Sequence, residues 1–261
     1  MKNRTFQAHI RRIFTMPMFY ICILLYFLLL MLPSLNPPTA NSFMSSRLNS
    51  LWYYAQSMST GMPYIAATVV PALAYAVTYM DDYDTRLLYV WAIRSGTERY
   101  AVSYFIATLA AGFLVAFGGN LLFLAVNDLR GFPFADGQIY EQTVYCRWYN
   151  EGHPVLYVLA HITEYALGAS AMAGMAAAIG CTFNKRVAML GLPAMYYFCY
   201  KLLPLPEWFN PYDLCGISDY AEIWAGTPLS NLGMKLLICA VYWTVCGWVT
   251  VRAIGRSVEN A

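Results

Sequence analysis

The chain alternates long apolar stretches with shorter polar segments. A helix that crosses a bilayer needs about 20 mostly apolar residues. Six stretches meet this requirement, at residues 13–33, 62–80, 101–126, 154–181, 187–204 and 232–253. No long polar stretch lies between them that could fold as a second, water-soluble unit. The pattern therefore predicts an all-α, polytopic membrane protein in which residues 1–261 form a single domain.

Composition and charge agree with this prediction and add an orientation. Of the 261 residues, 59% are hydrophobic and only 11% are charged, whereas soluble domains carry roughly 45–50% and about 25%. Six crossings put both termini on one side of the membrane. Basic residues concentrate on that side, at Lys2, Arg4, Arg11, Arg12, Arg86, Arg94, Arg99, Lys185, Arg186, Arg252 and Arg256. Because cytoplasmic segments are enriched in Lys and Arg, we expect a multi-pass protein of the bacterial cytoplasmic (inner) membrane with both termini in the cytoplasm.

Several chemistries find no support in the sequence. The net charge of +2 is too small to indicate nucleic-acid binding. The three histidines are scattered and no C-x-x-C or H-E-x-x-H motif occurs, so no metal site is predicted. The chain also lacks G-x-x-x-x-G-K-[ST], the loop that cradles nucleotide phosphates. We expect no cofactor on this chain, and any hydrolysis of ATP with Mg²⁺ would require a partner chain.

The segment between the second and third spans, residues 81–100, has the pattern of a short amphipathic helix. Aspartates open it where a helix N-terminus favours negative charge, and apolar residues follow at helical spacing until a Ser-Gly pair. These residues are Asp81, Asp82, Asp84, Leu87, Leu88, Trp91, Ile93, Ser95 and Gly96. Two interpretations remain open: an interfacial helix without a partner, or a helix that seats in a groove of a cytosolic protein.

This arrangement resembles the type-2 family of ATP-binding-cassette (ABC) exporter permeases. The resemblance rests on Arg11 and Arg12 before the first span, on Asp84-Thr85-Arg86-Leu87-Leu88, and on Arg94-Ser95-Gly96-Thr97-Glu98-Arg99-Tyr100 before the third span. In that family a basic, amphipathic N-terminal segment leads into six spans. A coupling helix lies between spans two and three and leads directly into span three.

The resemblance implies a permease subunit that exports a peptide, drug or lipid-like molecule. It further implies a dimer of permease chains, homomeric or heteromeric, embedded in lipid, with a cytosolic ABC ATPase bound at the coupling helix. The residues that would dock the ATPase are Asp84, Arg86, Leu88, Trp91, Arg94 and Arg99. Such a chain is not itself an enzyme. The alternatives are an intramembrane enzyme and a membrane scaffold or immunity protein.

His161 and Glu164 are the strongly polar pair inside the fourth predicted span. Their spacing of three residues puts them on one helix face, and an ionisable group at this depth is costly and therefore suggests function. Glu164 could line a substrate path, carry a proton, act with His161 as acid and base, or simply pair with it. Lys201 and Lys235, by contrast, lie close to the outer ends of their spans, where lysines extend to the lipid headgroups.

Two further expectations concern cysteines and small residues. Cys146 and Cys215 both fall in predicted external loops, where a disulfide can form. In the fourth span, Ser170, Gly174 and Ala178 stand four residues apart, and small residues at this spacing let helices approach closely. They predict tight packing, either against another span of the same chain or against a second permease.

Overall fold

A computed structural model of the chain describes residues 4–35, 62–131, 144–191 and 226–259, with the isolated positions 50, 54, 193, 195 and 214. Within these ranges the chain is helical and contains no strand. The helices are α1 (Arg4–Thr15), α2 (Pro17–Leu35), α4 (Met62–Tyr75), α5 (Thr78–Asp84), α6 (Leu87–Ser95), α7 (Thr97–Leu129), α8 (Cys146–Asn150), α9 (Pro154–Phe183) and α11 (Pro228–Glu259). The all-α prediction is thus confirmed for the described part of the chain.

Three of these helices, α7, α9 and α11, are long and apolar enough to cross a membrane. They contain the third, fourth and sixth predicted spans, residues 101–126, 154–181 and 232–253. Counting α1 and α2 as one bent segment gives up to four crossings in the described ranges. The architecture is compatible with a multi-pass membrane protein.

The first predicted span, residues 13–33, differs from the structure at its start. The helix is interrupted at Met16, and α1 is bent by 56° from the helix that follows. The physical cause is Pro17, which has no N–H to donate to the carbonyl of Ile13 and whose ring would clash with that carbonyl. The apolar helix of this predicted span therefore begins at Pro17, and α1 is a separate helix that precedes it.

The second predicted span, residues 62–80, is divided between α4 and α5. Two residues, Ala76 and Val77, interrupt it. At this break, side-chain hydroxyl groups donate hydrogen bonds to backbone carbonyls. The Thr78 hydroxyl donates to the Tyr75 carbonyl at 2.8 Å, and the Tyr104 hydroxyl donates to the Ala76 carbonyl at 2.7 Å. Satisfied carbonyls allow a helix to break inside a packed protein. Of the fifth predicted span, 187–204, only the helical residues 187–191 and positions 193 and 195 are described.

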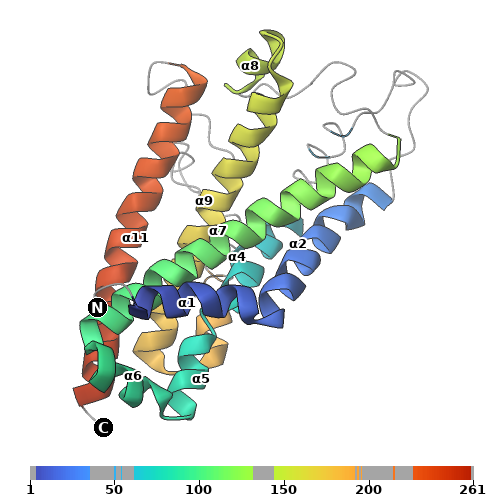
Figure 1. The fold of residues 1–261 in the computed structure, drawn as a ribbon. Helices are drawn as coiled ribbons and strands as arrows, with labels where there is room; N and C mark the ends of the chain where they lie inside the picture. The colour runs from blue at the N-terminus through green and yellow to red at the C-terminus, as the bar shows by residue number, and fades with distance from the viewer. Residues whose placement is uncertain are drawn as a thin grey trace.

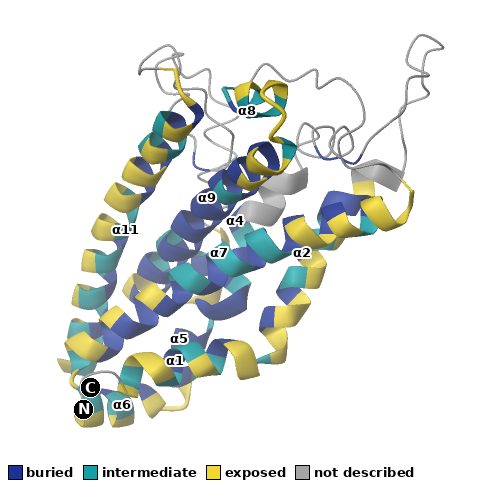
Figure 2. Ribbon diagram, turned by 45° about the horizontal axis from the view of Figure 1, so that its top comes forward, coloured by how far each residue is buried: buried dark blue, intermediate teal, exposed yellow. Residues whose placement is uncertain are grey.

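Helix α9 is the centre of the bundle. It contacts α4, α7, α8 and α11, and it is the most buried of the three long helices, whereas α11 is the least buried. Figure 2 shows this difference as a mostly dark-blue α9 beside an α11 with a continuous exposed side. Figure 1 shows that the N- and C-terminal ends of the described chain lie at the same end of the bundle.

Small residues bring α7 and α9 into close contact. A Cβ atom added at Gly112 of α7 would lie 2.8 Å from the Cβ of Ala173, and one added at Gly174 of α9 would lie 2.8 Å from Leu109. The small residues of the fourth predicted span, Gly174 among them, therefore pack inside the chain, which is one of the two expected outcomes. Close backbone approach of this kind is how membrane helices associate.

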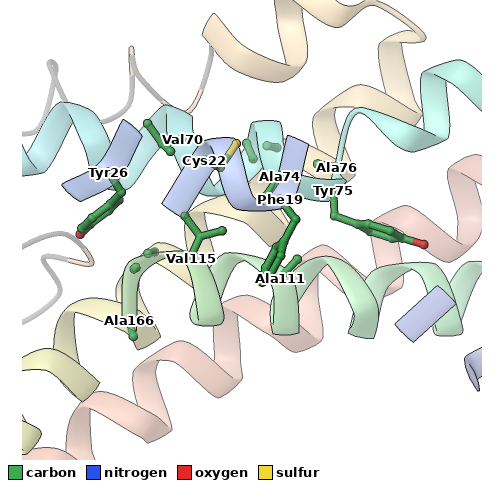
Figure 3. Packing of buried hydrophobic residues seen from close by; sticks show 14 of the residues in the cluster. Phe19, Cys22, Tyr26, Val70, Ala74, Tyr75, Ala76, Ala111, Val115 and Ala166 are labelled. Carbon is green, nitrogen blue, oxygen red and sulfur yellow. The ribbon is translucent and has the colours of Figure 1, made fainter. Parts of the chain in front are cut away.

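Helices α2 and α4 pack on the other side of α7. Phe19, Cys22 and Tyr26 recur three and four residues apart on α2 and are all buried, so they form one face of that helix. Figure 3 shows this face among Val70 and Ala74 of α4 and residues of α7. Tyr26 lies so close to α7 that a Cβ added at Gly119 would be 2.7 Å from its ring.

The close approach of α7 and α9 can be tested with two glycine substitutions in the same helix. Gly112→Ala adds a methyl group against the rigid Ala173 and the backbone of Ser170, whereas Gly118→Ala meets only Ile23 at 3.6 Å, an ordinary contact. Both changes favour the helix intrinsically, so overpacking decides the outcome. We expect Gly112→Ala to lower the thermal unfolding midpoint in detergent by several degrees and Gly118→Ala to leave it unchanged or raise it. Equal midpoints for the two variants would contradict the packing.

Candidate functional site

The segment predicted as an amphipathic helix over residues 81–100 contains one short helix, α6, that is set apart from its neighbours. Residues with positive φ bound it on both sides: Arg86 at +59° and Gly96 at +84°. Glycine adopts this conformation readily, whereas a residue with a side chain such as Arg does so only at a steric cost. These two positions turn the chain between α5, α6 and α7, so that α6 forms a separate element at one end of the bundle (Figure 1).

Helix α6 has one buried face and one exposed face. Leu88 and Ala92 are buried against the bundle, and Trp91 is half-buried beside the His9 ring, with the ring centroids 6.4 Å apart. The opposite face exposes Leu87, Val90, Ile93 and Arg94, of which Ile93 is 85% exposed. The predicted docking residues Leu88 and Trp91 therefore anchor α6 to the rest of the chain. The face available to a partner is apolar with a basic edge.

The sequence pattern predicted that the three aspartates begin an amphipathic helix. In the structure they lie at the end of α5 instead. Negative charge is unfavourable near a helix C-terminus because the backbone carbonyls there carry partial negative charge. Two arginines compensate for it. Arg12 of α1 pairs with Asp82 at 2.8 Å, and Arg186 contacts Asp81 at 2.8 Å and Asp84 at 3.0 Å.

Asp82 is the buried member of this group, with 1% of its side chain exposed. The same oxygen, Oδ2, that accepts a hydrogen bond from Arg12 also accepts one from the hydroxyl of Tyr100 at 2.9 Å. One carboxylate therefore joins α1, α5 and the first turn of α7. These are the elements on both sides of α6, so Asp82 fixes the position from which α6 projects.

His9 completes the contact between α1 and the bundle. Its Nδ1 lies 2.6 Å from the Tyr75 hydroxyl, and its ring packs edge-on to Tyr100 with centroids 5.2 Å apart. His9 precedes the first predicted span, residues 13–33, and shares its helix with Arg4, Arg11 and Arg12. Burial and, to a smaller extent, the nearby charge of Arg12 lower the pKa of His9 to about 4, against the opposing effect of Asp82. His9 is therefore neutral at physiological pH.

The remaining residues predicted to dock an ATPase lie at the same end of the bundle but on different elements. Asp84 is exposed and bound by Arg186. Arg94 is exposed at the end of α6, and Arg99 is exposed in the first turn of α7. Arg86 occupies the turn before α6 and lines a cavity of about 910 Å³ that lies between α6, α9 and α11.

Inside the spans, the structure gives Glu164 a partner that sequence reasoning missed. The Lys235 Nζ lies 3.8 Å from Glu164 Oε1, and neither side chain is exposed. The expectation that Lys235 extends to the headgroups is wrong, because its side chain lies on the face of α11 that packs against α9. The sequence signal was present, since one acid and one base each interrupt an otherwise apolar span. Opposite charges buried on neighbouring spans stabilise each other by pairing.

His161 and a second polar contact lie beside this ion pair. The His161 ring packs on Tyr157 and Tyr145, with centroids 4.4 Å and 5.1 Å away. The Asn231 amide donates to the Tyr145 hydroxyl at 2.9 Å. Asn231 and Lys235 are one helical turn apart on α11, so two successive turns of that helix carry polar contacts to the α8–α9 region. This buried polar cluster can hold the helices in register, and it contains the groups through which a proton could move.

The predictions about a disulfide and about metal binding can be compared with the structure only within the described residues. Cys146 is the first residue of α8, and Cys215 lies outside the described residues, so the predicted disulfide stays a prediction. Within the ranges that the structure covers, no three His, Cys, Asp or Glu side chains are placed to hold a metal ion.

Comparison with known proteins finds no family model that matches the chain and no significant match among curated proteins or solved structures. The geometry of the two regions above is therefore the basis for a functional proposal.

The buried His9 predicts a pH dependence of stability. Its pKa is lower in the folded protein, about 4, than the ordinary value of 6.5, so the unfolded chain binds the proton first as the pH falls. Stability from this group is fully present above pH 6.5 and is lost between pH 6.5 and pH 4. We expect the unfolding midpoint in detergent to fall over this window, and His9→Gln, which cannot be charged, to have a flatter profile. Parallel profiles for the two proteins would contradict the assignment.

The pair of Glu164 and Lys235 predicts non-additive substitutions. Lys235→Met or Glu164→Gln alone removes one member of the ion pair, which for buried pairs costs about 3–5 kcal/mol. We expect the double variant to unfold at a higher temperature than either single variant. The exposed pair of Arg147 and Glu151, at 2.9 Å, is the control, because exposed pairs contribute about 0–1 kcal/mol. A double variant as unstable as the sum of the two single effects would exclude the pairing.

Proposed function

We propose that this chain is the permease subunit of an ATP-driven ABC exporter, working with a separate cytosolic ATPase. The observation that carries the proposal is α6, a nine-residue helix held by its buried face while its apolar and basic face stays exposed at the end of the bundle. An amphipathic helix presented in this way suits a hydrophobic groove on a partner. The ATPase would supply the ATP and Mg²⁺ chemistry.

Two further features support the proposal. Helix α1 is a basic helix set at an angle to α2, which is similar to the amphipathic N-terminal segment that precedes the first span in the family. The ends of the described chain lie together (Figure 1), as an even number of crossings requires. The proposal includes six spans with both termini in the cytoplasm of a bacterial cell. Two permease chains, identical or different, would enclose the path.

The contacts around α6 suggest how a bound ATPase would move the spans. A shift of α6 acts on α5 through the turn at Arg86 and on α7 through Gly96. Helices α5 and α7 are also joined through Asp82 and Tyr100, so they move as one unit with α1. This unit packs on α9, the central helix. Movement of this unit against α9 would open a path for a peptide, a drug or a lipid-like molecule alternately to the two sides of the membrane.

The alternatives make different use of the buried polar cluster. An intramembrane enzyme would use His161 and Glu164 as acid and base, but Glu164 lies beside Lys235, and this pairing gives it a structural role without chemistry. In the export proposal the cluster either borders the substrate path or holds α9 to α11. A scaffold or immunity protein would need neither the cluster nor α6 for transport. The three functions therefore differ in which of the two regions tolerates substitution.

The exposed face of α6 gives the decisive test of ATPase docking. Ile93→Glu places a charge on that face, and Leu129→Glu is a matched control because Leu129 is 86% exposed at the opposite end of α7, compared with 85% for Ile93. We expect an ABC ATPase encoded beside this chain to co-purify in detergent with the wild type and with Leu129→Glu. Ile93→Glu should reduce the co-purified ATPase at least tenfold, because a charge on an apolar contact face is costly to bury.

A second variant, Arg94→Glu with Arg99→Glu, tests the basic edge of the same surface. Gel filtration of each variant shows whether it is folded. If the ATPase does not co-purify with a well-folded wild type, the export proposal is refuted. Loss of function with Glu164→Gln, together with tolerance of the α6 variants, would favour the intramembrane enzyme. Tolerance of both would favour the scaffold.

A further inference from the structure

A cavity of about 910 Å³ opens at the end of the bundle that carries both termini. Its wall comes from the turn before α6, from α6 itself, from the end of α9 and from the last turns of α11. The volume falls within the roughly 300–1,000 Å³ that is usual for small-molecule sites. Three arginines line it: Arg86, Arg252 and Arg256. The proposed docking of an ATPase at α6 leaves this cavity without a role.

The charge of the cavity is not balanced by the residues around it. No carboxylate lines it, and none of the three arginines forms an ion pair within the part of the chain that the structure describes. The acids of α5 are paired elsewhere, Asp81 and Asp84 with Arg186 and Asp82 with Arg12. Tyr83, Tyr89 and Ser257, whose side chains carry hydroxyl groups, are also among the lining residues. Guanidinium and hydroxyl groups together recognise phosphate, which arginine can bind through two parallel hydrogen bonds.

Two features oppose this positive charge without cancelling it. Arg252 and Arg256 also line a smaller cavity of about 380 Å³ that includes Glu98 and Glu259, but neither acid lies in an ion pair with them. The last carbonyls of α9 point toward this end of the bundle and carry partial negative charge. Asn184, at φ +50°, caps that end with a hydrogen bond to the Gly180 carbonyl. Three full positive charges outweigh these partial ones.

The surface of α11 favours a phospholipid as the source of a phosphate group for this cavity. An apolar stripe runs along the exposed face of this helix at spacings of three and four residues and ends at the cavity. Its members are Leu237, Val241, Val245 and Trp248, each between 57% and 59% exposed. Arg252 follows one turn later with its guanidinium 4.1 Å from the Trp248 ring centre, and Arg256 one turn after that. Apolar surface followed by Trp and then Arg is the order of groups met on passing from the acyl chains to the headgroups.

We propose that this cavity binds the headgroup of an anionic phospholipid, with its acyl chains lying along the exposed stripe of α11. Basic pockets between membrane helices on the cytoplasmic side bind such headgroups in other proteins. The lipid would contact Arg86 in the turn before α6 as well as Arg252 and Arg256 of α11. It would therefore bridge α11 to the α5–α6 turn, which the described contacts connect only weakly.

The test uses the purified full chain in detergent and native mass spectrometry, which reports bound lipid and oligomeric state together. The probes are dioleoylphosphatidylglycerol, dioleoylphosphatidylcholine with the same acyl chains, and inorganic phosphate. We expect phosphatidylglycerol to bind at least tenfold more tightly than phosphatidylcholine. The triple variant Arg86→Gln, Arg252→Gln, Arg256→Gln should lose this preference.

A matched triple variant controls for loss of charge alone. Arg4→Gln, Arg11→Gln, Lys185→Gln removes the same three charges from exposed positions at the same end of the molecule, and it should keep the preference. Equal loss in both triple variants would reduce the effect to general electrostatics and overturn the site. Inorganic phosphate that displaces phosphatidylglycerol at equal concentration would assign the cavity to a soluble anion.

If the cavity variant does not fold, measurements on the wild type alone still test the proposal. No preference for phosphatidylglycerol over phosphatidylcholine in the wild type would refute the proposal. A dimer without lipid adducts would assign the face to a second copy of the chain. None of these measurements involves an ATPase, so their outcome is independent of the export proposal.

Discussion

The arrangement of the end of the bundle that carries α6 (Figure 1) depends on one buried carboxylate. Asp82 is almost fully removed from solvent and accepts hydrogen bonds from Arg12 and Tyr100 through a single oxygen. An unpaired charge in such a place would cost several kcal/mol, so folding brings α1, α5 and α7 together around it. Two residues separate α6 from α5 and one residue separates it from α7, so the position of α6 follows from theirs.

The same physical rule operates in the middle of the bundle. Glu164 and Lys235 are each expensive to bury alone, and their pairing gives α9 and α11 a defined relative register that apolar side chains would set less strictly. Elsewhere the central helix packs through small residues, such as Gly174 and Ala173 against α7. The bundle thus combines close van der Waals contact on one side of α9 with a charge pair on another.

The exposed face of α6, proposed to dock an ATPase, and the basic cavity are adjacent and share this helix. Tyr89 of α6 lines the cavity, and Val90 and Ile93 face outward from the same helix. A partner on the outer face and a lipid in the cavity would therefore both act on α6, which only one buried face anchors. Two ligands that bias the position of one movable element are coupled in free energy. In the proposed exporter, membrane composition would therefore modulate the effect of the proposed ATPase on α6.

Local pattern and chemistry determined much of this protein from sequence alone. Apolar length predicted α7, α9 and α11, because the cost of exposing backbone groups to lipid leaves few alternatives to a helix. The Ser-Gly pair and the apolar spacing predicted one short amphipathic helix over residues 81–100, whereas the structure divides this segment among the end of α5, α6 (Leu87–Ser95) and the first turn of α7. Glu164 stood out as an acid inside a span. Each of these signals lies within one turn or one helix of the chain.

Contacts between distant segments were decided only by the tertiary structure. Asp82 is 70 residues from Arg12, and Arg186 is more than 100 residues from the aspartates that it binds. Nothing in the local sequence shows that Asp81, Asp82 and Asp84 end a helix, since acids favour the start of one. Leu88 and Ile93 are equally apolar in sequence, and packing alone decided that one is buried and the other exposed. Lys235 faces Glu164 because α11 happens to present that side to α9, and helix rotation is set by the sum of all packing contacts, which no single residue encodes.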